Sequence, residues 1–197
     1  MPKMIITKRR TDSEDFKVYH SKLSGGHFLK LNSTQAETSN TDVYPNTDPT
    51  STVYSLGNHA SVNGSGDTYI AFCYAEIPGY SKFGIYRGND SSDGVFNHCG
   101  FKPAMIITAG KNSSDAWVLW DNARDPDNVG HHRSYPNQAT VESTSINNAT
   151  SMVDFYSNGF KFRGSSDDTN GTGRHYIYMA FAEAPVSTPF GSSSLAR

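Results

Sequence analysis

The chain has little cysteine, little charge and no long apolar run. Cys73 and Cys99 are the only cysteines among 197 residues, too few for a disulfide framework or a structural zinc site. We interpret both as free thiols, although their number also permits a single bridge. The apolar segments are strand-sized and fall short of the roughly 20 residues that a membrane-spanning helix needs. We therefore expect no membrane insertion.

Charge of one sign is also lacking. Lysine and arginine together number 17, aspartate and glutamate number 19, and the net charge is −2 at pH 7. Such a chain has no field that would draw it onto nucleic acid, so we expect no nucleic-acid partner. Residues 1–6 show no charged region followed by an apolar core and a cleavage site, so we expect no secretory signal. They enter a predicted strand almost at once, and we expect the chain to be a piece of a longer protein.

Aromatic and turn-forming residues are abundant. The sequence contains 11 Tyr, 11 Phe and 17 Gly, whereas only 18% of its residues are charged. Aromatic residues favour strands, and Gly, Ser, Asn and Asp favour the turns between strands. A chain of this length also buries a sufficient core without metals or disulfides. We therefore predict an all-β protein built as an antiparallel β-sandwich.

The sequence repeats itself at a spacing of about 100 residues. The aligned segments are 2–7 with 103–108, 16–19 with 117–120, 50–53 with 150–153, 63–70 with 170–177, and 74–78 with 181–185. We predict a first β repeat over residues 1–80, a second over 81–190 and a tail over 191–197, and leave open whether the repeats form one sandwich or two. Residues 82–87 alternate like a strand that has no equivalent in the first repeat. The first repeat is therefore predicted to lack one strand or to receive it from elsewhere.

Strands are predicted wherever apolar and aromatic residues run between turn-forming clusters. Residues 105–107 and 176–181 are the most apolar, and we expect them to be covered on both faces. Helical periodicity is absent apart from short candidates such as residues 33–38, which would form one turn. The predicted strands are residues 3–8, 15–20, 27–31, 52–56, 60–62, 68–76, 83–87, 104–108, 116–121, 152–156, 160–163 and 175–183.

Four long motifs carry a resemblance to a known family. They are residues 100–107, 115–121, 154–163 with its Ser-Asn-Gly-Phe turn, and 176–185 with its Tyr-Ile-Tyr-Met-Ala-Phe-Ala-Glu run. The chain resembles the uncharacterised C-terminal repeat of large structural proteins of marine and cyanobacterial tailed phages. The resemblance covers nearly the whole chain and implies a concanavalin A-like or jelly-roll sandwich in a tail fibre or virion protein. The family has no established catalytic residues to carry over, and this chain departs from it before Pro2 and in the loop 124–134.

Two loops rich in Asp, Asn and Ser, residues 89–94 and 165–171, offer the oxygen ligands that Ca²⁺ prefers. The same residue types make turns, and neither loop has the spacing of an EF-hand, so turns are the favoured interpretation. Histidines are the other candidate ligands, but adjacent residues on a strand point to opposite faces and chelate one ion poorly. We predict no metal site and no cofactor. The histidines considered are His98, His131, His132 and His175.

Glu76 and Glu183 hold equivalent positions in the two repeats and are the candidate carboxylate pair for glycoside hydrolysis. Their duplication favours a shared structural role instead. No Gly-x-Ser-x-Gly motif is present, so we predict no enzyme activity and no catalytic residues. Aromatic side chains on a strand face stack on sugar rings, although in a sandwich they are more often core. The candidates for sugar contact are Trp117, Trp120, Tyr156 and Tyr178.

These observations together predict a phage virion structural protein, in the form of a tail-fibre or surface-attached module for assembly and for adhesion to a host-surface glycan. We expect it in the virion after assembly in the host cytoplasm. The expected partners are copies of itself, with a trimer favoured, and other virion proteins. Three alternatives remain open: a capsid decoration or cement protein without a ligand, a virion-associated glycan-degrading enzyme, and a secreted bacterial lectin-like module.

Overall fold

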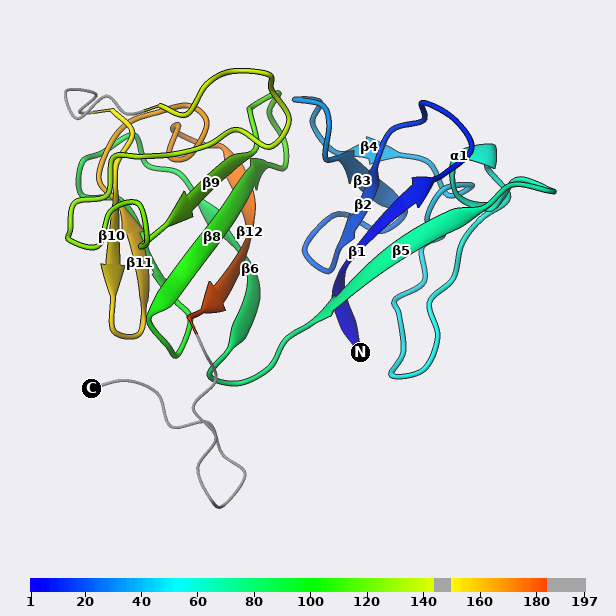
Figure 1. Ribbon diagram of the computed structural model, residues 1–197, viewed down its shortest axis with the longest axis horizontal. Helices are drawn as coiled ribbons and strands as arrows, with labels where there is room; N and C mark the ends of the chain where they lie inside the picture. The colour runs from blue at the N-terminus through cyan, green and yellow to red at the C-terminus, as the bar shows by residue number, and fades with distance from the viewer. Residues whose placement is uncertain (144–149, 184–197) are drawn as a thin grey trace, which may run out of the picture.

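A computed structural model describes residues 1–143 and 150–183 of the chain (Figure 1). In these residues the structure is almost entirely antiparallel strands, and this confirms the predicted all-β fold. The elements are β1 (Pro2–Arg9), β2 (Lys17–His20), β3 (His27–Lys30), β4 (Thr38–Ser39), α1 (Ala60–Asn63), β5 (Tyr69–Ala75), β6 (Ser81–Arg87), β7 (Phe96–His98), β8 (Pro103–Gly110), β9 (Val118–Asp121), β10 (Val153–Tyr156), β11 (Gly159–Phe162) and β12 (His175–Ala182).

The strands form three sheets. The N-terminal sheet has the order β4-β3-β2-β1-β5, the central sheet β6-β12-β8-β9, and the C-terminal sheet β10-β11-β7. Every strand pair within them is antiparallel. Figure 1 shows the central and C-terminal sheets on one side of the molecule and the N-terminal sheet on the other. The predicted boundary near residue 80 falls on the turn that connects β5 to β6, and the predicted tail 191–197 lies outside the described residues.

The central sheet is the middle layer of the structure. Side chains on one of its faces, such as Ile106 and Tyr178, pack against Phe160 and its neighbours in the C-terminal sheet. Side chains on the opposite face, such as Ile107 and Met179, pack against the N-terminal sheet. Because strand side chains alternate between faces, β8 and β12 are apolar at almost every position. The prediction that these two strands are covered on both faces is therefore confirmed.

Polar contacts also join the N-terminal and central sheets. The ring nitrogen Nε2 of His20, in β2, lies 3.2 Å from the carbonyl oxygen of Tyr178 in β12. The Trp117 indole Nε1 donates to the Lys30 carbonyl at 3.0 Å. Both contacts lie beside the apolar core that the two sheets share. Apolar packing and hydrogen bonds therefore both hold the sheets to each other.

Equivalent residues of the two predicted repeats occupy equivalent ladder positions. β5 pairs with β1 as β12 pairs with β8, and both ladders shift register at their proline end. The coincidence supports the two-repeat interpretation, which stays a prediction. The equivalent pairs are Met4–Tyr74 with Met105–Phe181, Ile6–Phe72 with Ile107–Met179, and Lys8–Ile70 with Ala109–Ile177.

Three local predictions are wrong. Residues 60–62 belong to helix α1, whose first turn is capped by the His59 side chain accepting from the Ser61 N–H. Residues 52–56 form no strand, because the Thr50 side chain holds a turn by accepting from the Val53 N–H at 3.0 Å. Residues 33–38 are not helical, and the short strands β4 and β7 were not predicted. Within the described residues, no helix has the length and apolarity to span a membrane.

Candidate binding surfaces

Strands β5 and β12 are aligned in the two predicted repeats, but they differ in the number of neighbouring strands and in the solvent exposure of their side chains. β12 lies between β6 and β8 inside the central sheet, whereas β5 is the last strand of the N-terminal sheet. Ile177 of β12 is 2% exposed and its equivalent Ile70 of β5 is 42% exposed. Met179 is 7% exposed and its equivalent Phe72 is 44% exposed. The free edge of β5 therefore presents large apolar side chains that the equivalent strand buries.

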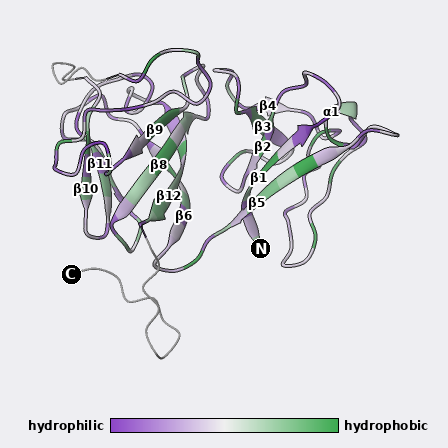
Figure 2. Ribbon diagram, in the orientation of Figure 1, coloured by the Kyte–Doolittle hydropathy of each residue, from purple (hydrophilic) through white to green (hydrophobic). Residues whose placement is uncertain are grey.

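Strand β5 has few of the usual protections of an edge strand. Natural edges carry charged residues, prolines or bulges that prevent pairing with another chain. The seven residues of β5 include no charge and no proline, and the bulge in its ladder with β1 lies only at the Ala75 end. Figure 2 colours the middle of β5 as hydrophobic, like parts of the buried strands β8 and β12. The edge is therefore a surface on which another strand can pair.

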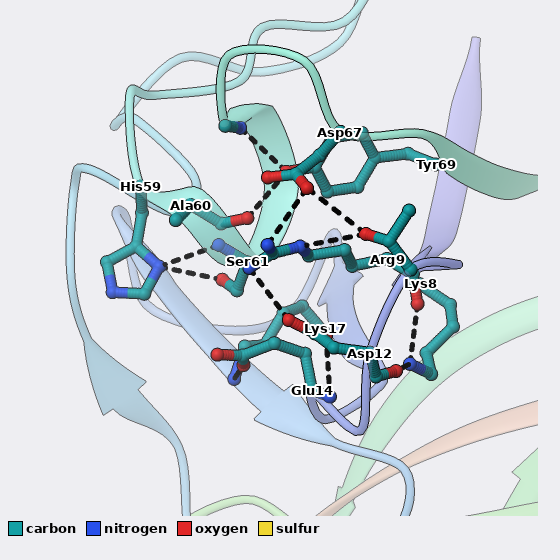
Figure 3. A network of polar contacts seen from close by, with 12 residues as sticks. Lys8, Arg9, Asp12, Glu14, Lys17, His59, Ala60, Ser61, Asp67 and Tyr69 are labelled. Atoms are coloured by element: carbon teal, nitrogen blue, oxygen red, sulfur yellow. Dashed lines mark hydrogen bonds and ion pairs between the residues drawn. The ribbon is translucent and has the colours of Figure 1, made fainter.

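A polar network fixes the beginning of β5 against its neighbours (Figure 3). The Arg9 guanidinium donates to the Asp67 carboxylate at 2.9 Å and pairs with Asp12 at 2.9 Å. The Tyr69 hydroxyl donates to the Ala60 carbonyl of α1 at 2.5 Å. These contacts hold the first residue of β5 to β1 and to α1. The exposed strand is consequently presented in one fixed orientation.

An apolar groove of about 510 Å³ lies where β5 and β12 end. Its aromatic wall contains Tyr74, Tyr80 and Phe181, and the ring centres of Tyr74 and Phe181 are 6.1 Å apart. Asp121 and Asn122 supply polar groups at the same groove. The sequence pattern did not reveal this site, although Tyr74 and Phe181 are aligned in the two predicted repeats. An aromatic residue kept at the same place in both repeats was the available signal.

Most of the aromatic candidates for sugar contact are core residues. Trp117, Trp120 and Tyr178 are 2%, 1% and 5% exposed, so they are not open to a ligand in this fold. Tyr156 is half-buried on the C-terminal sheet, where its hydroxyl donates to Asp154 at 3.0 Å and its ring contacts Phe96. The structure does not bring the four candidates together as one surface.

The two Asp-rich loops lie side by side and are joined by the buried Asn170. Its side-chain amide donates to Asn89 Oδ1 at 3.0 Å and to the Gly164 carbonyl at 2.8 Å. Three loop carboxylates are engaged elsewhere: Asp93 pairs with Lys161, Asp167 pairs with Arg174, and Asp168 accepts the Ala116 N–H at 3.0 Å. The favoured interpretation as turns agrees with this bonding. Among residues 1–143 and 150–183, no three His, Cys, Asp or Glu side chains are grouped to hold a metal ion.

The candidate histidines are dispersed over the fold. His131 and His132 both donate their backbone N–H to the Asp125 carboxylate at 2.6 Å, and His132 Nδ1 lies 2.6 Å from it. Partial burial opposes ionisation of Asp125, but these hydrogen bonds outweigh it and lower the pKa of that carboxyl group. His98 lies in β7 and His175 at the start of β12. Asp125 therefore organises a loop with its two neighbouring histidines.

The paired carboxylates and the cysteines have ordinary structural surroundings. Glu76 pairs with Lys82 at 2.7 Å, whereas Glu183 is exposed beside the apolar groove. Cys73 and Cys99 are both free, as interpreted from the sequence. Burial raises the pKa of the Cys99 thiol to about 12 and also raises that of Cys73, so neither has the lowered pKa of a reactive cysteine.

Comparison with known proteins gives one match. The family described as "Domain of unknown function (DUF7483)" matches residues 1–185 of the chain. No curated protein and no solved structure matches it.

Proposed function

This chain belongs to the DUF7483 family, and from its own residues we propose that it is a structural, non-catalytic module of a virion that assembles with other protein chains. The single observation that carries the proposal is the free edge of β5. It exposes Ile70 and Phe72 along a strand without charge or proline. A strand of a partner chain fits such an edge by adding main-chain hydrogen bonds and covering the apolar side chains. The resemblance to phage structural repeats supports the virion as the place of assembly.

The location of the chain tests the proposal. Particles are purified from a lysed culture that produces the chain, and the chain is located in them by high-resolution imaging. We expect it at regular positions in the particle, with β5 against a neighbouring chain. Its absence from purified particles overturns the proposal.

A substitution on β5 tests the carrying observation separately. The variant Phe72→Lys places a charge on the edge, and we expect its incorporation into particles to fall at least about tenfold. Phe96→Lys is the matched control, because Phe96 is 42% exposed and lies on another sheet edge. Equal incorporation of the two variants contradicts assembly through β5.

The aromatic groove favours adhesion to a host-surface glycan as a second function. Tyr80 and Phe181, with ring centres 6.0 Å apart, supply faces for stacking on a sugar, and Asn122 supplies hydrogen-bonding groups. The test is a glycan array probed with the chain and with Tyr80→Ala. We expect the variant to lose binding while Tyr156→Ala, on the C-terminal sheet, retains it. Absence of any bound glycan contradicts this second function.

A further inference from the structure

The free edge of β5 also indicates its occupant. Resting on the proposed assembly function, we propose that β5 pairs with β5 of a second copy of this chain. The two strands run antiparallel about a two-fold axis at Phe72, and they join two N-terminal sheets into one continuous sheet.

The equivalent strand shows what kind of cover this edge takes. In the central sheet, β6 runs antiparallel to β12 and places Phe83 opposite Met179 and Ile85 opposite Ile177. β5 pairs with β1 in the same way that β12 pairs with β8. The edge of β5 that has no partner strand among the described residues therefore corresponds to the edge of β12 that pairs with β6. The missing element is therefore an antiparallel strand with apolar residues at alternate positions.

The sequence of β5 is itself such a strand. Antiparallel pairing centred on Phe72 places Phe72 opposite the partner's Phe72 and Ile70 opposite the partner's Tyr74. All of these side chains lie on the face that carries Met4 and Ile6. Cross-strand pairs of aromatic and β-branched residues are the favourable kind. On the opposite face, Ala71 lies beside the partner's Cys73, so small residues meet small residues.

Charges outside the paired region agree with the same register. The pairing places Thr68 opposite the partner's Glu76, beyond the end of the apolar strand. Arg10 donates its backbone N–H to the Thr68 carbonyl at 2.8 Å, and its side chain is exposed. Within the described residues the Arg10 guanidinium makes no ion pair. The two-fold arrangement therefore brings the Arg10 guanidinium toward the ion pair that the partner's Glu76 makes with Lys82 of its own chain, at each end of the interface.

Symmetry fixes the number of copies. A strand that pairs with its own equivalent makes an isologous contact, which closes after two copies. The expected trimer requires a heterologous contact between two different edges, so this geometry favours a dimer instead.

Mass measurement over a range of concentrations tests the pairing. Light scattering on the purified chain, up to about 1 mM, is expected to show a monomer–dimer equilibrium. We expect Phe72→Lys and Ile70→Lys each to raise the dissociation constant at least about tenfold, and Phe96→Lys to leave it unchanged. Both β5 positions are more than 40% exposed, so the folded monomer tolerates the lysine, which circular dichroism verifies. A monomer at every concentration, a trimer, or a dimer that survives both β5 substitutions overturns the inference.

Disulfide trapping tests the register. Ala71→Cys places a new thiol opposite the partner's Cys73, so mild oxidation is expected to give a covalent dimer. Residues 71 and 73 of one strand are too far apart to bridge each other. The double variant Ala71→Cys, Cys73→Ser keeps one thiol on the strand but removes the thiol expected opposite it on the partner. It is expected to form no covalent dimer under the same oxidation. Cross-linking of the double variant to the same extent contradicts the Phe72-centred register.

The inference and the proposed function fail in different ways. If the chain is monomeric but Phe72→Lys still blocks incorporation into particles, β5 binds a different protein, and only the inference fails. If the chain dimerises through β5 but Phe72→Lys enters particles normally, only the proposed assembly function fails.

Discussion

Strands β5 and β12 have the same ladder, almost the same length and similar sequences, yet one is at an edge and the other in a core. The difference comes from the neighbours and not from the strands. β12 has β6 on its open side and the C-terminal sheet on one face, whereas β5 has neither. An apolar strand is therefore consistent with two environments, and the surrounding elements decide which one it occupies. Under the pairing proposed above, the exposed apolar side chains of β5 are the part of the interface that one copy of the chain supplies.

The largest expected effect compares one substitution at two equivalent positions. Ile177→Ala removes a side chain that is 2% exposed, and we expect it to lower the free energy of unfolding by about 4 kcal/mol. Ile70→Ala removes one that is 42% exposed, and we expect a loss below about 1 kcal/mol. Urea unfolding measures both, at a concentration at which the chain is monomeric. Equal losses would show that β5 is covered within the single chain.

The second effect concerns the contact between His20 of the N-terminal sheet and the Tyr178 carbonyl of β12. Burial lowers the pKa of His20 to about 4, although its bond to the Tyr178 carbonyl opposes the shift. The folded state holds His20 neutral, whereas the unfolded chain takes up a proton below about pH 6.5. Stability is therefore lost as the pH falls from about 6.5 to about 4, by up to about 3 kcal/mol.

The variant His20→Gln isolates this dependence. Glutamine keeps one donor for Tyr178 and one acceptor for the Lys22 N–H, which bonds His20 Nδ1 at 3.2 Å. It does not titrate, so the slope of stability against pH between about 4 and 6.5 is expected to flatten. Unfolding curves at several pH values measure the slope, and the same slope in both proteins assigns the acid sensitivity to other groups.

The third effect concerns the close packing of β6 on β12. Gly84 of β6 lies against the Tyr178 ring, and a Cβ added there would be 2.4 Å from a ring carbon. We expect Gly84→Ala to destabilise the chain by about 2 kcal/mol, because backbone or ring must move. Gly66→Ala is a poor control, since Gly66 has a φ of +79°. Ser92→Ala in the same turn-rich region as Asp90 is the better one, because Ser92 is exposed. An equally small loss in both variants would contradict close packing of β6 on β12.

Sequence pattern located most of the strands, because alternation and turn residues are local properties. It failed where local interactions compete with the pattern, as at His59, which caps a helix, and Thr50, which holds a turn. It also left open how the predicted repeats are arranged, since the stacking of three sheets depends on contacts far apart in the chain. The candidate site was half predicted: a missing strand beside the first repeat followed from residues 82–87, but the exposure of Ile70 and Phe72 did not.

The smallest expected effect compares two aligned aromatic residues where the N-terminal and central sheets meet. Trp117 and Phe16 are aligned in the two predicted repeats, but only the tryptophan has a ring N–H, which it donates to the Lys30 carbonyl at 3.0 Å. Trp117→Phe keeps an aromatic ring but removes one donor to that carbonyl, which still accepts the Ser33 N–H at 3.3 Å. We therefore expect a loss of about 1 kcal/mol beyond the packing change. Phe16→Leu, a substitution of similar size without any hydrogen bond, measures the packing contribution for comparison. If Trp117→Phe costs no more than Phe16→Leu, the indole bond contributes nothing to the attachment of the sheets, and the contact of His20 with the Tyr178 carbonyl is left as the directional bond between them.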